Sequence, residues 1–252
     1  MAIAHVQSGG TATDNATSAS RATASNVTAG GLLVIEVTCY KGANNDPFVV
    51  GDISKSAGTA TVGAFTLDIQ RNFNYTGSFY MNTAIFSCLV TGTGTCTITV
   101  GGAPSGSYWN VVVGEFSGNW DAARVEATNS AEATTGAPSS GDATSAGAAL
   151  FIGGLTTNTA VSTTHTQDAA FSLMDEEEDG SAHITGAGIY EIVGGGTTDA
   201  ASWTAPTTAE WAAVVAVYKE AAGGGGDPIR LLFPTPLDGV GSGGRFLGNR
   251  LQ

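Results

Sequence analysis

Hydrophobic and polar residues alternate along much of the chain, in short segments that end at Gly, Asn or Ser. Between Thr95 and Val100, Cys96, Ile98 and Val100 share one face and the threonines share the other. Alternation with a period of two predicts β-strands with one buried and one wet face. The clearest strands are expected at Leu32–Tyr40, Ala64–Gln70, Phe79–Val90, Thr95–Val100 and Tyr108–Phe116.

Two further segments extend this picture. In Ala64–Gln70, the residues Phe65, Leu67 and Ile69 form an inward row. Glu210–Ala221 is apolar on both faces, which is typical of a central strand buried on both sides. No segment has a convincing helical period. The pattern therefore predicts an all-β, antiparallel β-sandwich of the jelly-roll-like kind.

A faint internal repeat relates four pairs of these segments, with offsets of 117, 106, 104 and 102 residues. It indicates two similar units, about 30–120 and 147–222, although chance similarity among simple β segments is an alternative. Two such units can form one sandwich or two packed domains, and we favour a single sandwich core. Trp109 and Trp211 would anchor the core, and Glu126–Gly147 would be the long connection. The pairs are Gly31–Ile35 with Ala148–Ile152, Phe65–Leu67 with Phe171–Leu173, Ala84–Phe86 with Gly188–Tyr190, and Tyr108–Phe116 with Glu210–Tyr218.

Composition and charge narrow the classes of partner. Only 12% of the 252 residues are charged and 36 are Gly, which disfavours helix bundles and suits strands joined by tight turns. The net charge of −13 argues against nucleic acid and anionic membranes, because both need a cationic face.

The N-terminus has no basic and apolar stretch typical of a signal peptide, so we expect the protein to be made and folded in the cytosol. In that reducing compartment, Cys39, Cys88 and Cys96 are expected to be small buried residues. Cys88 and Cys96 flank a Thr-Gly-Thr-Gly tip and could face each other across a hairpin, so their pairing stays open. His5, His165 and His183 have no zinc-ligand spacing.

The character of the chain changes after Ala222. Residues 223–226 are four glycines, which form a flexible joint. The segment 223–252, which we call the arm, carries a net charge of +1 and leaves −14 on residues 1–222. Pro228, Pro234 and Pro236 favour an extended path. The domain prediction is a β-sandwich body, 1–222, with an extended C-terminal arm, 223–252.

The arm is richer in large apolar side chains than a solvated tail would be. We expect it to dock on a neighbouring subunit, by strand addition or in a groove, which makes a homo-oligomer the expected state. The alternative is that it folds back on its own sandwich. The predicted partner-binding residues are Ile229, Arg230, Leu232, Phe233, Arg245, Phe246 and Leu247.

No motif selects a catalytic, cofactor or metal site. Gly239–Gly244 matches GxGxxG but lacks the strand and helix that phosphate binding needs. The carboxylates of Asp175–Asp179 could bind Ca²⁺, but a solvated loop is favoured because the EF-hand spacing is absent. A Ser-His-Asp set could be assembled, but no spacing selects one. A less favoured idea is a sugar-binding platform built from Tyr75, Phe79, Tyr80, Tyr108 and Trp120.

The Gly30–Ile35 segment, together with Trp211–Tyr218 and the following Lys219, resembles a β-sandwich pattern of tailed-phage virion proteins. In that pattern, an early strand with glycine and an apolar run pairs with a late strand that starts at Trp and ends in an aromatic residue and Lys. The resemblance covers about 1–222 and consists of core residues. It implies a jelly-roll-like sandwich in a capsid decoration, head-fibre or tail-associated protein, made in the host cytoplasm and located in the virion.

The expected function is therefore that of a non-enzymatic virion structural protein, a capsid decoration or cement protein that assembles through its arm. Other virion proteins or neighbouring subunits would be its partners. One alternative is a tail or fibre module that binds a host glycan, which predicts exposed aromatics in a shallow groove. A polysaccharide-degrading enzyme is a third and less favoured class.

Overall fold

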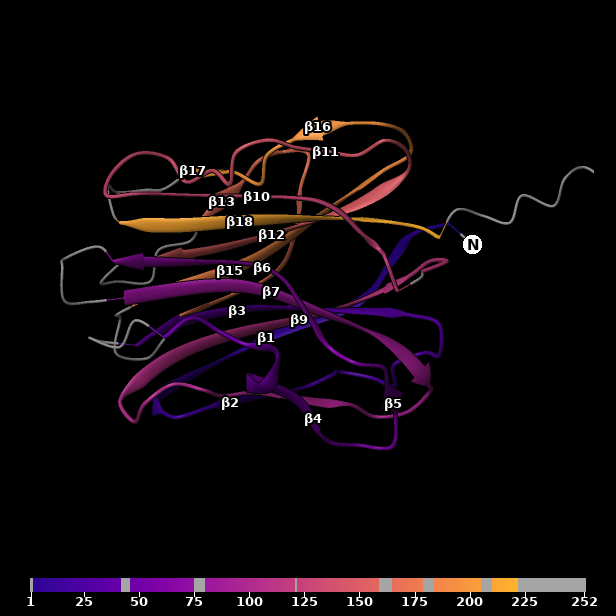
Figure 1. Cartoon of the computed structure of the whole chain (residues 1–252), viewed down its shortest axis with the longest axis horizontal. Coiled ribbons are helices and arrows are strands. Elements are labelled where there is room, and N and C mark those ends of the chain that lie inside the picture. Colours follow the sequence, from indigo (N-terminus) through magenta and orange to yellow (C-terminus); the bar gives the residue numbers. More distant parts are fainter. Residues whose placement is uncertain are drawn as a thin grey trace, which may run out of the picture. The chain divides into compact units, whose positions relative to one another are not determined.

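A computed structural model describes residues 2–41, 46–74, 80–120, 122–158, 165–178, 184–204 and 210–221 (Figure 1). The chain divides into one compact unit, Met1–Ala221, and a second unit, Ala222–Gln252. The described residues form antiparallel strands and one short 3-10 helix, η1 (Val50–Asp52), and contain no α-helix. The all-β, antiparallel sandwich class is confirmed. No helix among these residues is long and apolar enough to cross a membrane.

Two large sheets form the centre of the compact unit, and their inner faces pack on each other (Figure 1). The first has the order β1 (Ala4–Ala16), β9 (Ser107–Ser117), β3 (Leu32–Tyr40), β7 (Tyr80–Gly92) and β5 (Thr61–Val62), with β6 (Thr66–Asn74) also paired to β7. The second has the order β10 (Val125–Ala133), β18 (Trp211–Lys219), β12 (Ala149–Thr157), β15 (Thr185–Val193) and β14 (Ser172–Glu178).

Small sheets cover the two outer faces. The face of the first large sheet that points away from the second packs on a three-stranded sheet, β2 (Ala19–Ala22), β8 (Thr97–Val100) and β4 (Ile53–Ala57). The outer face of the second packs on two ladders, β11 (Ala143–Thr144) with β16 (Thr198–Asp199), and β13 (Thr166–Gln167) with β17 (Trp203–Thr204). Figure 1 shows this stack of layers with the small sheets outermost.

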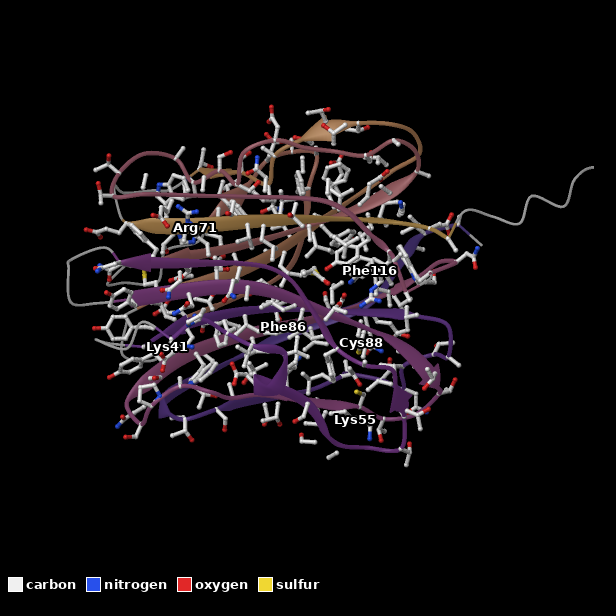
Figure 2. All side chains as sticks on the ribbon, in the orientation of Figure 1. Lys41, Lys55, Arg71, Phe86, Cys88 and Phe116 are labelled. Atoms are coloured by element: carbon white, nitrogen blue, oxygen red, sulfur yellow. The ribbon has the colours of Figure 1, made fainter. Side chains whose placement is uncertain are left out.

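The expectation of one sandwich core is therefore too simple, because the buried side chains form three main layers. Alternation along the strands explains this. On β7, Phe86 and Cys88 point to the layer under β2–β8–β4, and Ile85 points to the layer between the large sheets. Phe116 on β9 also belongs to that central layer (Figure 2). Each large sheet is buried on both faces, so its middle strands are continuous apolar runs.

Most strand predictions agree with the structure. Leu32–Tyr40 matches β3, and Glu210–Ala221 contains β18, a central strand paired with both β10 and β12. Trp109 and Trp211 are core residues, as predicted. The predicted connection Glu126–Gly147 is wrong, because it contains β10 and β11. Its small, polar residues suit an edge strand, which is half-buried along most of its length.

The inward row of Phe65, Leu67 and Ile69 is also wrong at its last member. The pairing of β6 with β7 shifts between Leu67 and Ile69, which places a bulge at Asp68. Leu67 packs with the outer layer, and Ile69 packs with the central layer. One extra residue in a strand turns the following side chains to the opposite face.

The repeat is visible in the strand order. The first sheet reads β1-β9-β3-β7-β6 and the second reads β10-β18-β12-β15-β14, so each pair of similar segments lies on strands in equivalent places. Leu32 pairs with Phe116 and Leu150 pairs with Tyr218, which makes Leu150 the counterpart of Leu32, 118 residues later.

Two of the four predicted offsets were one residue out of register. The sequence comparison placed β12 117 residues after β3 and β15 104 residues after β7, whereas strand pairing gives 118 and 103. For β7 and β15, Phe86 and Ile189 both lie opposite the leucine of β6 or β14. A slip of one residue exchanges the two faces of a strand, and both faces are apolar here, so the pattern could not fix the register.

Candidate functional site

The partner-binding residues predicted in the arm lie outside the described residues. They are Ile229, Arg230, Leu232, Phe233, Arg245, Phe246 and Leu247. The sites built below therefore belong to the compact unit.

The described members of the predicted aromatic platform lie at two different ends of the first large sheet. Tyr75 and Phe79 lie outside the described residues. Tyr108 stands at the beginning of β9, and Trp120 follows the other end of the same strand. Trp120 is buried in the central layer, where its indole nitrogen donates to the Phe116 carbonyl at 3.2 Å. Tyr80 begins β7 at the end of the sheet where Tyr108 begins β9, and both strands pair there with β3 next to Tyr40. Trp120 therefore does not belong to a platform with Tyr80 and Tyr108.

The acidic run is not a solvated loop, as its pattern suggested, because its first four residues belong to the edge strand β14. The backbone N–H of Gly10 donates to Asp175, and the Ser8 hydroxyl donates to the Met174 carbonyl at 2.8 Å. Burial is the main cause of a raised pKa for the Glu177 carboxyl, and the neighbouring Asp175 adds to it. The run thus links the two large sheets. Within the part of the chain that the structure describes, no group of three or more His, Cys, Asp or Glu could hold a metal ion.

His165 is held between an acid and a hydroxyl. Its Nδ1 lies 2.7 Å from Glu176 Oε1, and its Nε2 lies 3.2 Å from Thr157 Oγ1. Such an order of acid, imidazole and hydroxyl can activate a nucleophile. Thr157 is only 1% exposed, so a substrate could not reach its hydroxyl without local opening. We interpret the cluster as a clamp that ties β14 to β12. No sequence spacing selects these residues, because the strands meet only in the sheet.

A second buried polar network lies where the two large sheets meet. The Asp68 carboxylate, which shares a face of β6 with Thr66, accepts from the hydroxyls of Ser87 and of Tyr218, the latter at 2.6 Å. Arg124 donates to Ser87 at 2.7 Å and to Thr66 at 2.8 Å. Burial raises the pKa of Tyr218 well above its ordinary value, and Asp68 adds to the shift. Sequence reasoning missed this network, because the face of β6 that carries Asp68 looked solvent-exposed, whereas the second large sheet covers it.

Glu36 is a buried carboxyl at the middle of the central layer. It is fully buried on β3, and burial raises its pKa to about 8. Its Oε1 accepts from Thr38 at 2.9 Å and from Thr83 at 3.3 Å. Oε2 has no hydrogen-bond partner among the described residues. A carboxyl in such a place is favoured in its neutral form.

Two surface grooves formed by described residues offer further candidate sites. One, the polar groove, crosses the outer ladders near β13 and β17, and it is lined by hydroxyl, amide and carboxylate side chains beside an indole. The other, the apolar groove, lies where β1 begins and β9 ends. The polar groove is lined by Ala137, Pro138, Ser139, Thr166, Gln167, Asp168, Ser202, Trp203 and Thr204, and the apolar groove by Val6, Thr28, Ala29, Gly30, Gly31, Glu115, Ser117 and Gly118.

Most cations of the compact unit are engaged within it. Arg71 pairs with Glu132, and Lys55 Nζ donates to the Gly58 carbonyl at 2.6 Å (Figure 2). Lys41 is buried, and its Nζ lies 4.0 Å from the centre of the Phe48 ring. Arg124 is buried in the Asp68 network. Lys219, by contrast, is exposed.

The three cysteines are buried free thiols, as the composition suggested. Burial raises the pKa of each thiol, to about 12 for Cys88. Cys88 lies on β7, and Cys96 directly precedes β8, so the two belong to different sheets. They are packing residues of the first outer layer rather than reactive groups.

With this geometry in place, the chain was compared with known proteins. No protein-family model matches it, no curated protein matches it, and no solved structure matches it.

Proposed function

We propose that the protein is a virion structural protein, a capsid decoration or cement protein that assembles into homo-oligomers through its C-terminal arm. The observation that carries the proposal is the division of charge and apolar side chains along the chain. Residues 1–222 have a net charge of −14, whereas 223–252 have +1 and eight large apolar side chains. The resemblance to tailed-phage sandwich proteins supports the virion assignment.

The packing of the compact unit supports an assembly role for the arm. Both faces of each large sheet are already covered among the described residues, so sheet faces are not left for a partner. Its basic side chains are largely engaged internally, which leaves an acidic exterior. A mildly basic, apolar arm complements such a surface. Tethered arms bind at high effective concentration, and a symmetric lattice multiplies that effect.

The apolar groove is the place that we propose for the arm of a neighbouring copy. Its rim includes Val6, which is 47% exposed, and Gly30, which has no side chain to fill the groove. Gly30 has a φ of +89°, and a Cβ added there would meet nothing within 4 Å.

Self-capture tests this assembly. Tagged and untagged full-length chains are mixed, and capture is compared with that of a variant lacking 223–252 and of Val6→Asp. Both changes should abolish capture and leave the circular dichroism of the body unchanged. Val49→Asp, at a residue 55% exposed on a different surface, is the matched control and should capture normally. If the truncated protein still self-associates, the arm is not the assembly element. Mass spectrometry of purified particles tests the virion assignment separately.

A host-glycan-binding module is the second candidate, and the polar groove favours it. Asp168, Gln167 and the neighbouring hydroxyls offer the hydrogen-bonding groups that sugars require, close to Trp203. A glycan array with the wild-type protein should then show binding that Asp168→Ala removes and that Ser56→Ala, on the opposite outer sheet, leaves intact. An array without hits would remove this candidate.

A further inference from the structure

The contacts between the two large sheets follow a two-fold pattern. Strand β6 contacts β10 and β18, and its counterpart β14 contacts β1 and β9. Strand β7 contacts β12 and β18, and its counterpart β15 contacts β3 and β9. Strand β3 contacts its own counterpart, β12. Exchanging each strand for its counterpart reproduces the same set of contacts, which is the property of an isologous interface.

Bulges repeat under the same operation. The shift after Leu67 on β6 recurs after Leu173 on β14, and the shift at Val6 on β1 recurs at Glu126 on β10. The indole nitrogens of Trp109 and Trp211 both donate to carbonyls at the C-terminal ends of the edge strands β1 and β10, those of Ala16 and Thr135. The two units therefore share their irregular features as well as their strand order.

On a two-fold axis, a residue meets its own counterpart. The offset of 118 residues between β3 and β12 makes Gly154 the counterpart of Glu36. These two residues face each other across the central layer, because a Cβ built on Gly154 would lie 2.8 Å from Glu36 Cγ. The pseudo-two-fold axis therefore passes close to this pair.

The two counterpart residues at the axis differ in chemistry, because one carries a carboxyl and the other has no side chain. Pairing the first unit with a copy of itself would bring two buried carboxyls together, and pairing the second with itself would leave a hole between two glycines. The fused arrangement places one carboxyl in the space left by one glycine. Thr156, the counterpart of Thr38, has a buried hydroxyl with no hydrogen-bond partner among the described residues, whereas Thr38 donates to Glu36.

A second pair of counterpart positions differs in the same way. The bulge residue of the first unit is Asp68, which binds the hydroxyls of Ser87 and Tyr218. Its counterpart, Met174, packs instead in the apolar part of the central layer. There the ring of Tyr190, the counterpart of Ser87, stacks on His5 with centroids 4.7 Å apart. One side of the interface is thus a polar network and the other an aromatic cluster.

We infer that residues 4–117 and 125–219 are two sandwich units joined as a pseudo-two-fold dimer within one chain, and that Glu36 and Gly154 determine which units pair. Each inner face fits the other unit and disfavours a second copy of itself. Building in a mismatch against the wrong partner is a general route to specificity. Copies of this protein therefore meet through other surfaces. This inference is independent of the arm.

Exchanging the two axis residues tests the inference in the full chain. Gly154→Glu should lower the urea midpoint strongly, because it places two carboxyls at the axis. The double variant Glu36→Gly with Gly154→Glu restores one carboxyl and one glycine, with Thr156 ready to donate. It should regain at least roughly half of the lost midpoint, since residues in contact couple and distant ones add. A double variant as unstable as Gly154→Glu, or less stable, would overturn the assignment.

A matched control places the second carboxyl off the axis. Gly188 is the counterpart of Ile85 rather than of Glu36, so Glu36→Gly should not rescue Gly188→Glu. If Glu36→Gly restores the urea midpoint of Gly188→Glu as much as it restores that of Gly154→Glu, the inference is wrong. Where Gly154→Glu fails to fold, recovery of soluble, folded protein by the double variant gives the same answer.

The pairing itself can be tested by cutting the connection between the units. A protease site inserted between the exposed Ala122 and Ala123 separates the units covalently. The cut protein should elute with the uncut protein as a one-to-one pair of fragments. After partial unfolding and refolding of two differently tagged cut proteins, mixed pairs of first and second units should form. Separation of the fragments, or pairs of two first units, would contradict the inference.

Discussion

Glu36 shows how a single residue couples packing to charge. Its carboxyl lies among apolar strands and threonine hydroxyls, and the pKa of about 8 reflects burial first and two hydrogen bonds second. The described groups that act on this pKa are the hydroxyls of Thr38 and Thr83, with no charged side chain among them. Water would stabilise the ionised form in the unfolded chain, so ionisation opposes folding.

Replacing this carboxyl should therefore change the pH dependence of stability. Because the pKa is raised in the folded state, the protonated carboxyl favours folding below about pH 4.5, and that contribution is lost as the pH rises through about 8. Glu36→Gln cannot ionise, so its free energy of unfolding relative to wild type should increase with pH over this range, by at most about 1.4 kcal/mol per pH unit. Urea titrations at several pH values measure it.

The exposed Asp142 supplies the control for this experiment. The free energy of unfolding of Asp142→Asn should change with pH in the same way as that of the wild type, over the same range of about pH 4.5 to 8. If the free energy of unfolding of Glu36→Gln differs from that of the wild type by the same amount at every pH, Glu36 does not titrate in the folded protein over this range.

Glycines on the inner strand faces set the distance between the two large sheets. A strand glycine often marks a close approach of another chain segment. A Cβ on Gly186 of β15 would lie 2.9 Å from Asn110 Cβ and 3.1 Å from Thr38 Cβ, both on the opposite sheet. Neither of these atoms is the end of a flexible side chain, so a methyl group at Gly186 would force the sheets apart.

Gly186→Ala should thus destabilise the protein by about 1–3 kcal/mol, the usual cost of overpacking a well-packed core. A shift in the urea midpoint with an unchanged slope measures the effect. Gly194→Ala is the matched control in the loop after β15, because a Cβ there meets nothing within 4 Å. Equal midpoints for the two variants would mean that the close approach at Gly186 does not limit the sheet spacing.

The elements also show where sequence reasoning reaches its limit. Hydrophobic patterning predicted β3, β9 and β18 well, since each is long and apolar. It could not predict the bulge at Asp68, because a bulge adds one residue without changing the residue types. It also could not set the register of β12 and β15 against β3 and β7. Where both faces of a strand are apolar, a slip of one residue leaves the pattern almost unchanged.

At the scale of the whole molecule, the central layer decides whether the two units behave as one. It contains Leu32, Val34 and Phe116 from the first unit and Leu150, Ile152 and Val214 from the second, all fully buried. Loss of either unit would expose this layer to water, at roughly 25 cal/mol per Å² of apolar surface. The units are therefore expected to be thermodynamically coupled.

Thermal unfolding should accordingly show a single transition, with equal calorimetric and van't Hoff enthalpies. The variant that lacks 223–252 should unfold at the same temperature under monomeric conditions, because the compact unit ends at Ala221. Differential scanning calorimetry measures both. Two resolved transitions would indicate units that fold independently, and would point to a weaker central layer than the packing implies.

The sequence by itself determined the fold class, the long central strands, the burial of Trp109, Trp211 and the cysteines, and the uneven division of charge between body and arm. These are local or additive properties, which alternation and composition record directly. Only the tertiary structure decided which faces meet. It set Glu36 against Gly154, turned Asp68 toward Tyr218, and brought His165 between Glu176 and Thr157. Those contacts join residues far apart along the chain, and they depend on registers and bulges that side-chain patterns leave open.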